Sequence, residues 1–457
     1  MKPLSPADAM FLMIEGRRQP MHVGGLQLFT PPAGAGKHFV TELVEMLRGY
    51  ETPESPYNLR PVFRMGRWHW VEDEQFDLEH HFRHSSLPNP GRIRELLTLV
   101  SRWHSSMLDR SRPLWEIHMI EGLADKRFAL YGKVHHAMFD GVAAMKITTS
   151  TFAPTRGKEQ MPPWWAVPKP KRTRSTLNEP AVMNPISAIV QSLGDNYRVF
   201  PGMAKGMWEL VRSSKTDPLE AKPYQAPKSI FNTKVSASRR FAAQSFPIAR
   251  IKAVGKATGA TLNDVVLAMC SGAMRDYMKQ QRALPKEPLI AMVPVSVRAA
   301  DGPEEGNQIS LILANLATHV SDPGKRLQQI VGSTKRAKAK LQQMTRVEQI
   351  AYAAASMSPM PLTMLLGADR VRPPFNVVIS NVPGPAKTLY WNGARLDEMY
   401  PVSIPIDGVA LNITLTSYVD TIGFGYTACR RALPSMQRLL DYTETALRDL
   451  EQAAGIS

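Results

Sequence analysis

A proline-rich stretch near the middle of the chain restricts the fold more than any other feature. Across residues 153–230, prolines recur through "MPPWWAVPKPKRTR" and again through "DPLEAKPYQAPKS". Proline lacks a backbone donor and has a fixed φ, so neither run suits the interior of a helix or a central strand. The chain of 457 residues is also longer than one hydrophobic core usually organises. These features predict two domains, 1–152 and 231–457, joined by a crossover over 153–230 that has room for broken helices.

Helix and strand signals alternate on both sides of this crossover. Before it, apolar residues recur at helical spacing in "KHFVTELVEML" and "GRIRELLTLVSRWHSSML", and strand-like alternation runs through "GGLQLF", "WEIHMI" and "RFALYGKV". After it, helices are expected at "TLNDVVLAMCSGAMRDYMKQQ", with Thr261 and Asp264 as a capping box, and at "LPSMQRLLDYTETALRDLEQ". Strands are expected at "LIAMVPVSV", "SLILANLAT", "FNVVISNV", "VALNITLTSY" and "TIGFGYTAC". Each half is therefore predicted to be an α/β layer, a mixed sheet with helices.

Composition limits the cellular compartment and the kinds of binding partner that we expect for the protein. A formal net charge of +16 favours an anionic lipid surface or an acidic small ligand. Nucleic acid is disfavoured, because zinc-finger spacing, a basic zipper and an RNP-like aromatic motif are all missing. Cys270 and Cys429 are expected to be buried thiols in a reducing compartment. The first residues lack the unbroken apolar stretch of a secretory signal, and no window holds about 18 consecutive apolar residues. We therefore expect a cytoplasmic protein with, at most, peripheral membrane contact.

The segment "HHAMFDG", residues 135–141, concentrates chemically useful side chains. A strand delivers His135 and His136 to a turn, and Asp140 and Gly141 follow one helical turn later. The residues permit three interpretations: a turn capped by polar side chains, a metal site on His136 and Asp140, or a catalytic base at His136. The metal site needs further ligands, and no Cys or His cluster stands nearby. A base needs a histidine held in one tautomer and orientation, which a nearby carboxylate can provide.

The same segment resembles the HHxxxDG signature of the CoA-dependent acyltransferase superfamily, which includes chloramphenicol acetyltransferase and the condensation domains of peptide synthetases. Further segments follow the order of one family within it: "PLSPADAMFLMIE" at 3–15, "PLWE" at 113–116, "LND" at 262–264, "PVSVR" at 294–298, "GNQIS" at 306–310 and "SNVPGP" at 380–385. The chain is thus similar, nearly from end to end, to the bacterial wax ester synthase/diacylglycerol acyltransferases.

This resemblance implies an α/β fold of two chloramphenicol-acetyltransferase-like domains with an active-site tunnel between them. It implies transfer of a long-chain acyl group from acyl-CoA, as co-substrate, to a fatty alcohol or to diacylglycerol, with no bound cofactor and no metal. The chain has no G-x-S-x-G elbow, so direct transfer fits better than a serine acyl-enzyme. Contact with a membrane or lipid-droplet surface would be peripheral. A condensation-type enzyme using carrier-protein thioesters and a non-catalytic lipid-binding relative remain the alternatives.

The resemblance also assigns roles to single residues. His136 would be the general base, and His135 would position the loop. Asp140 would pair with Arg298 and not touch substrate, although a surface salt bridge is the alternative for Arg298. Asn263 would donate a hydrogen bond near the site, unless it only helps to start a helix.

Smaller residues would shape the tunnel. Gly141 ends the motif, and Ala144 lies on the same helix face as Asp140, where its small side chain would leave space for an acyl chain. Trp115 is assigned to the core. Three residues of "SNVPGP" would form a rigid turn in the tunnel wall: Asn381, Pro383 and Gly384.

Overall fold

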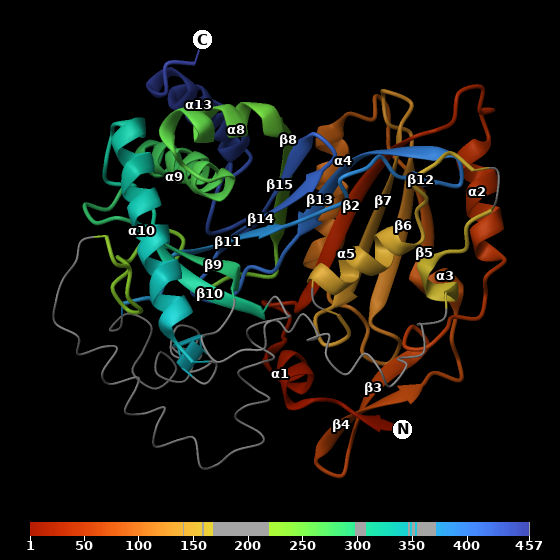
Figure 1. Cartoon of the computed structure of the whole chain (residues 1–457). Helices are drawn as coiled ribbons and strands as arrows, with labels where there is room; N and C mark the ends of the chain where they lie inside the picture. The colour runs from red at the N-terminus through yellow and green to blue at the C-terminus, as the bar shows by residue number, and fades with distance from the viewer. Residues whose placement is uncertain are drawn as a thin grey trace.

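The computed structural model describes residues 1–139, 141–157, 160–167, 219–297, 308–345, 348–349, 352–353 and 372–456. Two α/β halves lie side by side, one built mainly from the N-terminal part of the chain and one from the C-terminal part (Figure 1). Each half contains a six-stranded sheet with both parallel and antiparallel pairs. The predicted two-domain α/β fold is confirmed.

The first sheet has helices on both faces. Its strand order is β12-β13-β2-β7-β6-β5. Along β2, Val23 and Phe29 pack with α2 (Phe39–Arg48), whereas Leu26 and Leu28 pack with α4 (Ile93–Ser105), because successive side chains of a strand point to opposite faces. The strands are β2 (His22–Thr30), β5 (Phe82–Ser86), β6 (Trp115–Glu121), β7 (Phe128–His135), β12 (Tyr390–Trp391) and β13 (Ala394–Val402). The shorter helices of this half are α3 (Leu78–His81), α5 (Gly141–Ser150) and the 3-10 turn η1 (Trp164–Ala166).

The second sheet has the order β10-β9-β11-β14-β15-β8. Its strands are β8 (Arg239–Pro247), β9 (Ile290–Val297), β10 (Gln308–Asn315), β11 (Val377–Val382), β14 (Leu411–Tyr418) and β15 (Thr421–Cys429). Four helices pack with it in one hydrophobic core (Figure 1): α8 (Ile248–Thr258), α9 (Leu262–Gln280), α10 (Pro323–Gln343) and α13 (Arg438–Ala453). Fourteen of the nineteen residues of α9 are buried, so α9 is the central helix of this core.

Strand β13 joins the two halves. It comes from the C-terminal part of the chain, yet it pairs antiparallel with β2 of the first sheet. It also crosses β15 at backbone distance, because a Cβ on Gly423 or Gly425 would collide with the carbonyl oxygens of Met399 and Pro401. The glycines of "TIGFGYTAC" therefore allow the two sheets to meet without side chains between them.

A small third sheet and one helix lie at the N-terminal edge. The sheet has the order β1-β4-β3, with β1 (Lys2–Pro3), β3 (Leu59–Arg64) and β4 (Arg67–Glu72). Helix α1 (Pro6–Ile14) begins where the Ser5 side chain accepts a hydrogen bond from the Asp8 amide at 3.1 Å and where proline occupies the first turn. Its Phe11 and Leu12 are buried in a cluster that includes Ala137 of the histidine motif.

Most elements foreseen from the sequence are present. Each segment predicted as a strand or a helix contains one, and the Thr261–Asp264 capping box is formed. Trp115 is fully buried, and Cys270 and Cys429 are free, buried thiols. The pairing of β13 with β2 was not foreseen, and the domain limits of 1–152, 153–230 and 231–457 stay a prediction. No helix in the parts of the chain that the structure describes is long and apolar enough to cross a bilayer.

Candidate functional site

The histidine motif begins at the end of β7 and is fixed to neighbouring strands by its backbone. The amide of His135 donates to the carbonyl of Leu114 at 2.9 Å, and the amide of His136 donates to the carbonyl of Met21 at 2.8 Å. The amide of Met138 then donates back to the carbonyl of His135 at 2.9 Å, which closes the turn. Both histidines are thus held by hydrogen bonds that do not depend on their side chains.

The imidazole of His136 packs flat against Phe11 of α1. The ring centroids are 4.2 Å apart and the planes differ by 17°. Burial, with a smaller contribution from the neighbouring His135, lowers the pKa of His136 to about 4. The ring is therefore neutral near pH 7, with an unprotonated nitrogen that can accept a proton.

His135 has a different environment and is fully buried. Its Nδ1 accepts a hydrogen bond from the amide of Ala137 at 3.1 Å, which leaves Nε2 as the nitrogen that carries a proton. That Nε2 lies 3.4 Å from a carboxylate oxygen of Glu15. The first histidine is therefore held through Nδ1 and lies inside the protein with Nε2 facing the Glu15 carboxylate, and its role in positioning the loop stays a prediction.

Glu15 is the residue that sequence reasoning missed. Its side chain has no exposed surface, and its two oxygens accept from the Met21 amide at 2.9 Å and from the Arg110 guanidinium at 2.9 and 3.1 Å. Burial alone would raise the pKa of Glu15, but its contacts with the His135 ring, the Met21 amide and Arg110 together lower it. The carboxylate thus connects His135 to Met21, whose carbonyl receives the amide of His136. Its signal in the sequence is one charged residue at the end of the otherwise apolar "MFLMIE".

A second buried ion pair explains the segment "PLWE". Lys133 of β7 lies 3.2 Å from a carboxylate oxygen of Glu116 and donates to the carbonyls of Trp103 and Ser106 at 3.2 and 3.0 Å. Burial would raise the pKa of Glu116, but the hydrogen bond from His118 and the charge of Lys133 lower it to about 2. Because the ammonium group of Lys133 already has three acceptors, we assign the pair to structural stabilisation and not to chemistry.

Two of the predicted wall residues come together at the start of α9. The side-chain amide of Asn381, on β11, donates to the side-chain carbonyl of Asn263 at 3.1 Å. The next residue, Asp264, bonds Thr261 in the capping box and also accepts from the Thr334 hydroxyl at 2.6 Å. Asn263 is therefore both a residue of the first helical turn and the partner of Asn381, and the sequence did not predict this contact.

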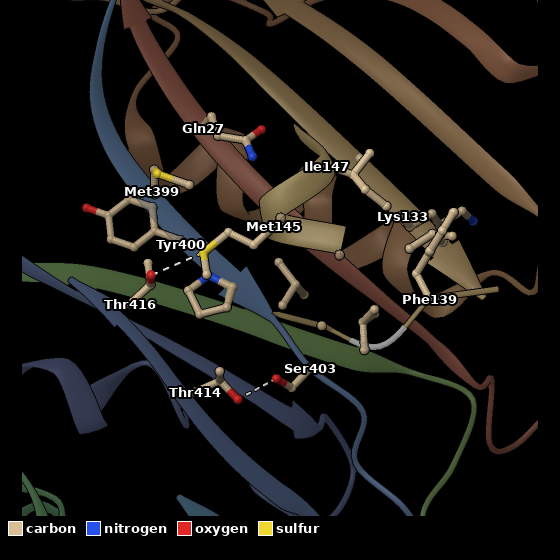
Figure 2. A pocket seen from close by; sticks show the side chains of 18 of the residues that line it. Gln27, Lys133, Phe139, Met145, Ile147, Met399, Tyr400, Ser403, Thr414 and Thr416 are labelled. Atoms are coloured by element: carbon tan, nitrogen blue, oxygen red, sulfur yellow. Dashed lines mark hydrogen bonds between the residues drawn. The ribbon is translucent and has the colours of Figure 1, made fainter. Parts of the chain in front are cut away.

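An apolar cavity of about 110 Å³ lies between the two halves. Figure 2 shows that Phe139, Met145 and Ile147 extend into it from the motif and from α5, opposite Thr414 and Thr416 of β14. Its other apolar lining residues include Val23, Val134, Trp164, Val382, Met399, Pro401 and Val402. The Thr416 hydroxyl donates to the sulfur of Met145 at 3.3 Å, so the two halves touch across this space.

Three glycines form part of the cavity wall, so that backbone atoms are exposed there without side chains. Gly25 and Gly132 are register partners on β2 and β7, and both line the cavity with Gly24. A Cβ on Gly132 would meet no atom within 4 Å, whereas a Cβ on Gly24 would come within 2.8 Å of the carbonyl oxygen of Gly132. Gly132 therefore leaves room for a ligand, and Gly24 is needed for close packing.

The motif meets the cavity at Phe139 and Gly141. These residues flank Asp140 and both line the cavity, and the space beside Gly141 is open. His136 is not among the described lining residues, so the described residues of the motif that reach the cavity are Phe139 and Gly141.

The remaining predicted residues are placed differently. Pro383 is exposed, and a Cβ on Gly384 would collide with the carbonyl of Ser417, so Gly384 permits a close backbone approach. Asp140, Arg298 and the side chain of Ala144 lie outside the described residues, as does most of the crossover, so the Asp140–Arg298 pair stays a prediction. Within the described ranges, no group of three or more His, Cys, Asp or Glu side chains is arranged to hold a metal ion.

Comparison with known proteins places these features in one family. Residues 4–266 match the wax ester synthase/diacylglycerol acyltransferase catalytic domain, and residues 305–451 match the C-terminal domain of the same family. The chain is 45% identical over 458 residues to a probable diacylglycerol O-acyltransferase of Mycobacterium tuberculosis, covering 99% of both chains. It is 45% identical over 455 residues to the O-acyltransferase WSD of Acinetobacter baylyi, covering 99% of this chain and 97% of that one.

Solved structures agree with the sequence relatives. The wax ester synthase/diacylglycerol acyltransferase of Marinobacter aquaeolei VT8 matches over the whole of both chains, with a TM-score of 0.81 and 44% identity. The first condensation domain of the CDA synthetase matches 99% of this chain and 96% of its own, with a TM-score of 0.55 and 15% identity, which supports the shared fold alone. The chain therefore belongs to the wax ester synthase/diacylglycerol acyltransferase family and is an O-acyltransferase.

Proposed function

We propose that the protein transfers a long-chain acyl group from acyl-CoA directly to a fatty alcohol or to diacylglycerol, with His136 as the general base. The observation that carries the proposal is the neutral imidazole of His136, which stacks on Phe11 in a motif whose Phe139 lines the apolar cavity. The relatives carry the names of both activities, which supports both acceptors.

In the proposed reaction His136 accepts the hydroxyl proton as the acceptor oxygen attacks the thioester carbon. The tetrahedral intermediate collapses with cleavage of the carbon–sulfur bond, and the CoA thiolate leaves and takes the proton from the imidazolium. General base catalysis of this kind contributes roughly 10²- to 10⁴-fold. Holding acyl donor and acceptor together supplies much of the remaining acceleration.

The buried carboxylate of Glu15 supports this reaction indirectly in our proposal. It fixes His135 and the Met21 strand, and the Met21 carbonyl in turn holds the backbone of His136. Asp140 and Arg298 are proposed to form an ion pair that holds the other end of the motif, and neither would touch substrate. These contacts keep the imidazole in one orientation, which a general base requires.

The cavity is proposed to hold one of the two lipid chains. Its lining is mostly apolar, and the open space above Gly132 suits a methylene chain. The formal charge of +16 supports binding of the CoA phosphates and peripheral contact with anionic lipid. No cofactor is needed for this chemistry, since both substrates supply the reacting atoms.

The test is a transfer assay with purified protein. Palmitoyl-CoA is offered with hexadecanol or with diacylglycerol, and released CoA and the ester product are both measured. His136→Ala should reduce ester formation by at least roughly 10²-fold. His38→Ala, which removes an exposed histidine at the start of α2, is the control and should leave the rate unchanged.

Two outcomes would contradict the proposal. Ester formation that survives in a folded His136→Ala protein would remove His136 from the mechanism. A wild-type protein that ignores acyl-CoA but accepts acyl groups from a carrier protein would favour the condensation-type alternative, and one that only binds lipid would favour the non-catalytic one.

A further inference from the structure

The β3–β4 hairpin has two large apolar side chains that are mostly exposed, one of them the most exposed of its kind among the described residues. Phe63 is 58% exposed and Met65 is 97% exposed. The hairpin extends from the lower edge of the molecule beside α1 (Figure 1). Isolated exposed apolar residues are common, but here two of them lie at the tip of one projecting element.

Methionine is an unusual residue for the backbone conformation at the tip of this hairpin. Arg64 pairs with Arg67, so Met65 and Gly66 form a two-residue turn, with φ values of +49° and +76°. Turns with positive φ at both central residues strongly prefer Asn-Gly, because a side chain such as methionine fits the left-handed region poorly. The chain therefore places a long apolar side chain at a position where folding favours asparagine, which suggests a use for that side chain.

Charge is distributed unevenly along the hairpin. At its base, Arg60 pairs with Asp73 at 3.7 Å. At its tip, Arg64 and Arg67 are exposed, and neither is within 4.0 Å of a carboxylate among the residues that the structure describes. The ring of Phe63 lies 5.3 Å from that of Trp68, so aromatic and cationic groups occupy the same end.

The hairpin is attached firmly to the histidine motif. Trp68 and Trp70 pack against the cluster that contains Phe11 and Ala137. Phe11 stacks on the His136 ring, and Ala137 follows His136 in the chain. Arg110, the partner of Glu15, also lies over the Trp68 ring at 6.0 Å. A surface that held the hairpin tip would therefore hold the catalytic motif at a fixed distance.

We propose that the β3–β4 tip docks the protein on an anionic lipid surface, with Met65 and Phe63 entering the interface and Arg64 and Arg67 contacting headgroup phosphates. Apolar side chains flanked by cations match an interface that is apolar below and anionic above. Nucleic acid would use the arginines but has no place for Met65. Docking itself is independent of the proposed reaction, while its use in bringing long-chain substrates to the motif rests on that reaction.

The experiment compares full-length variants on vesicles of phosphatidylcholine with and without phosphatidylglycerol. Met65→Asn supplies the residue that the turn prefers, so its thermal midpoint should equal or exceed the wild-type value while its binding to anionic vesicles falls roughly 5- to 10-fold. Arg64→Gln with Arg67→Gln should weaken binding to the anionic vesicles by about 25-fold, at about fivefold for each arginine. Ile93→Asn is the control, because Ile93 is 42% exposed on α4, and its binding should not change.

Each outcome decides the proposal. The proposal is overturned if Met65→Asn binds anionic vesicles as tightly as the wild type. It is also overturned if the protein binds both vesicle types equally and the arginine substitutions do not change that binding. Weaker binding to a nucleic acid duplex but not to vesicles in the arginine variant overturns it in favour of that partner. Transfer between octanoyl-CoA and dissolved hexanol separates docking from catalysis. The tip variants should keep this activity. If the wild type and all variants lack the activity but bind vesicles as predicted, the proposed function is wrong and the docking proposal stands.

Discussion

Replacement of Gly132 by leucine tests whether the cavity between the halves holds a lipid chain. A Cβ on Gly132 meets no atom within 4 Å, so the new side chain can enter the cavity without displacing the sheet. Four added carbon atoms would take the place of about four methylene groups of substrate. At about 0.8 kcal/mol for each buried methylene, the loss is at most about 3 kcal/mol, or roughly 150-fold in kcat/KM. Chains too short to pass Gly132 should be unaffected.

The assay measures kcat/KM along two series. One series runs from octanoyl-CoA to stearoyl-CoA with a fixed alcohol, and the other varies the alcohol with a fixed donor. The series whose optimum moves to shorter chains identifies the chain that lies over Gly132. Gly24→Ala is the matched control, because its Cβ would come within 2.8 Å of the Gly132 carbonyl and should lower stability without moving either optimum. If Gly132→Leu folds normally and both optima stay in place, the lipid chain does not lie in this cavity.

Three further predictions concern the motif and its support. Glu15→Gln should lower the free energy of unfolding by about 3 kcal/mol, since it removes a fully buried carboxylate that bonds the half-buried Arg110, and should reduce kcat by roughly 10- to 100-fold. A wild-type urea midpoint would show that the carboxylate is not needed. Burial lowers the pKa of His104 to about 3, so below about pH 6.5 the unfolded chain gains a proton that the folded chain does not. Unfolding free energy should then fall by up to about 1.4 kcal/mol per pH unit for this histidine as pH drops toward 3, and His104→Asn should flatten that slope in thermal unfolding. Ala144→Phe should shift the preferred acyl chain to shorter lengths, and an unchanged acyl profile would exclude Ala144 from the chain-binding wall.

Sequence patterns predicted local structure well because helix and strand periodicities are local. The helix from Leu262 and the strands around Phe128 and Leu411 follow from spacing and capping within a few residues. The fold class also followed, since mixed signals on both sides of a proline-rich crossover leave few architectures.

Contacts between distant residues could not be obtained in this way. Glu15 lies 120 positions before His135, and nothing in the spacing joins the two. The Asn381–Asn263 contact spans 118 positions. The motif predicts His136 as the base, but the stacking of Phe11 on its ring and the open space at Gly132 depend on packing between distant residues, which spacing along one sequence does not reveal.

The pairing of β13, from the C-terminal part of the chain, with β2 of the first sheet has a consequence for folding during synthesis. The Thr30 hydroxyl bonds the Asp397 carboxylate, 367 positions later, so one side of β2 has no neighbouring strand until nearly the whole polypeptide has left the ribosome. An open strand edge attracts other chains, which makes the nascent N-terminal half a natural client for chaperones. Fragments cut within the crossover should likewise be insoluble when expressed singly and recover when they are produced together.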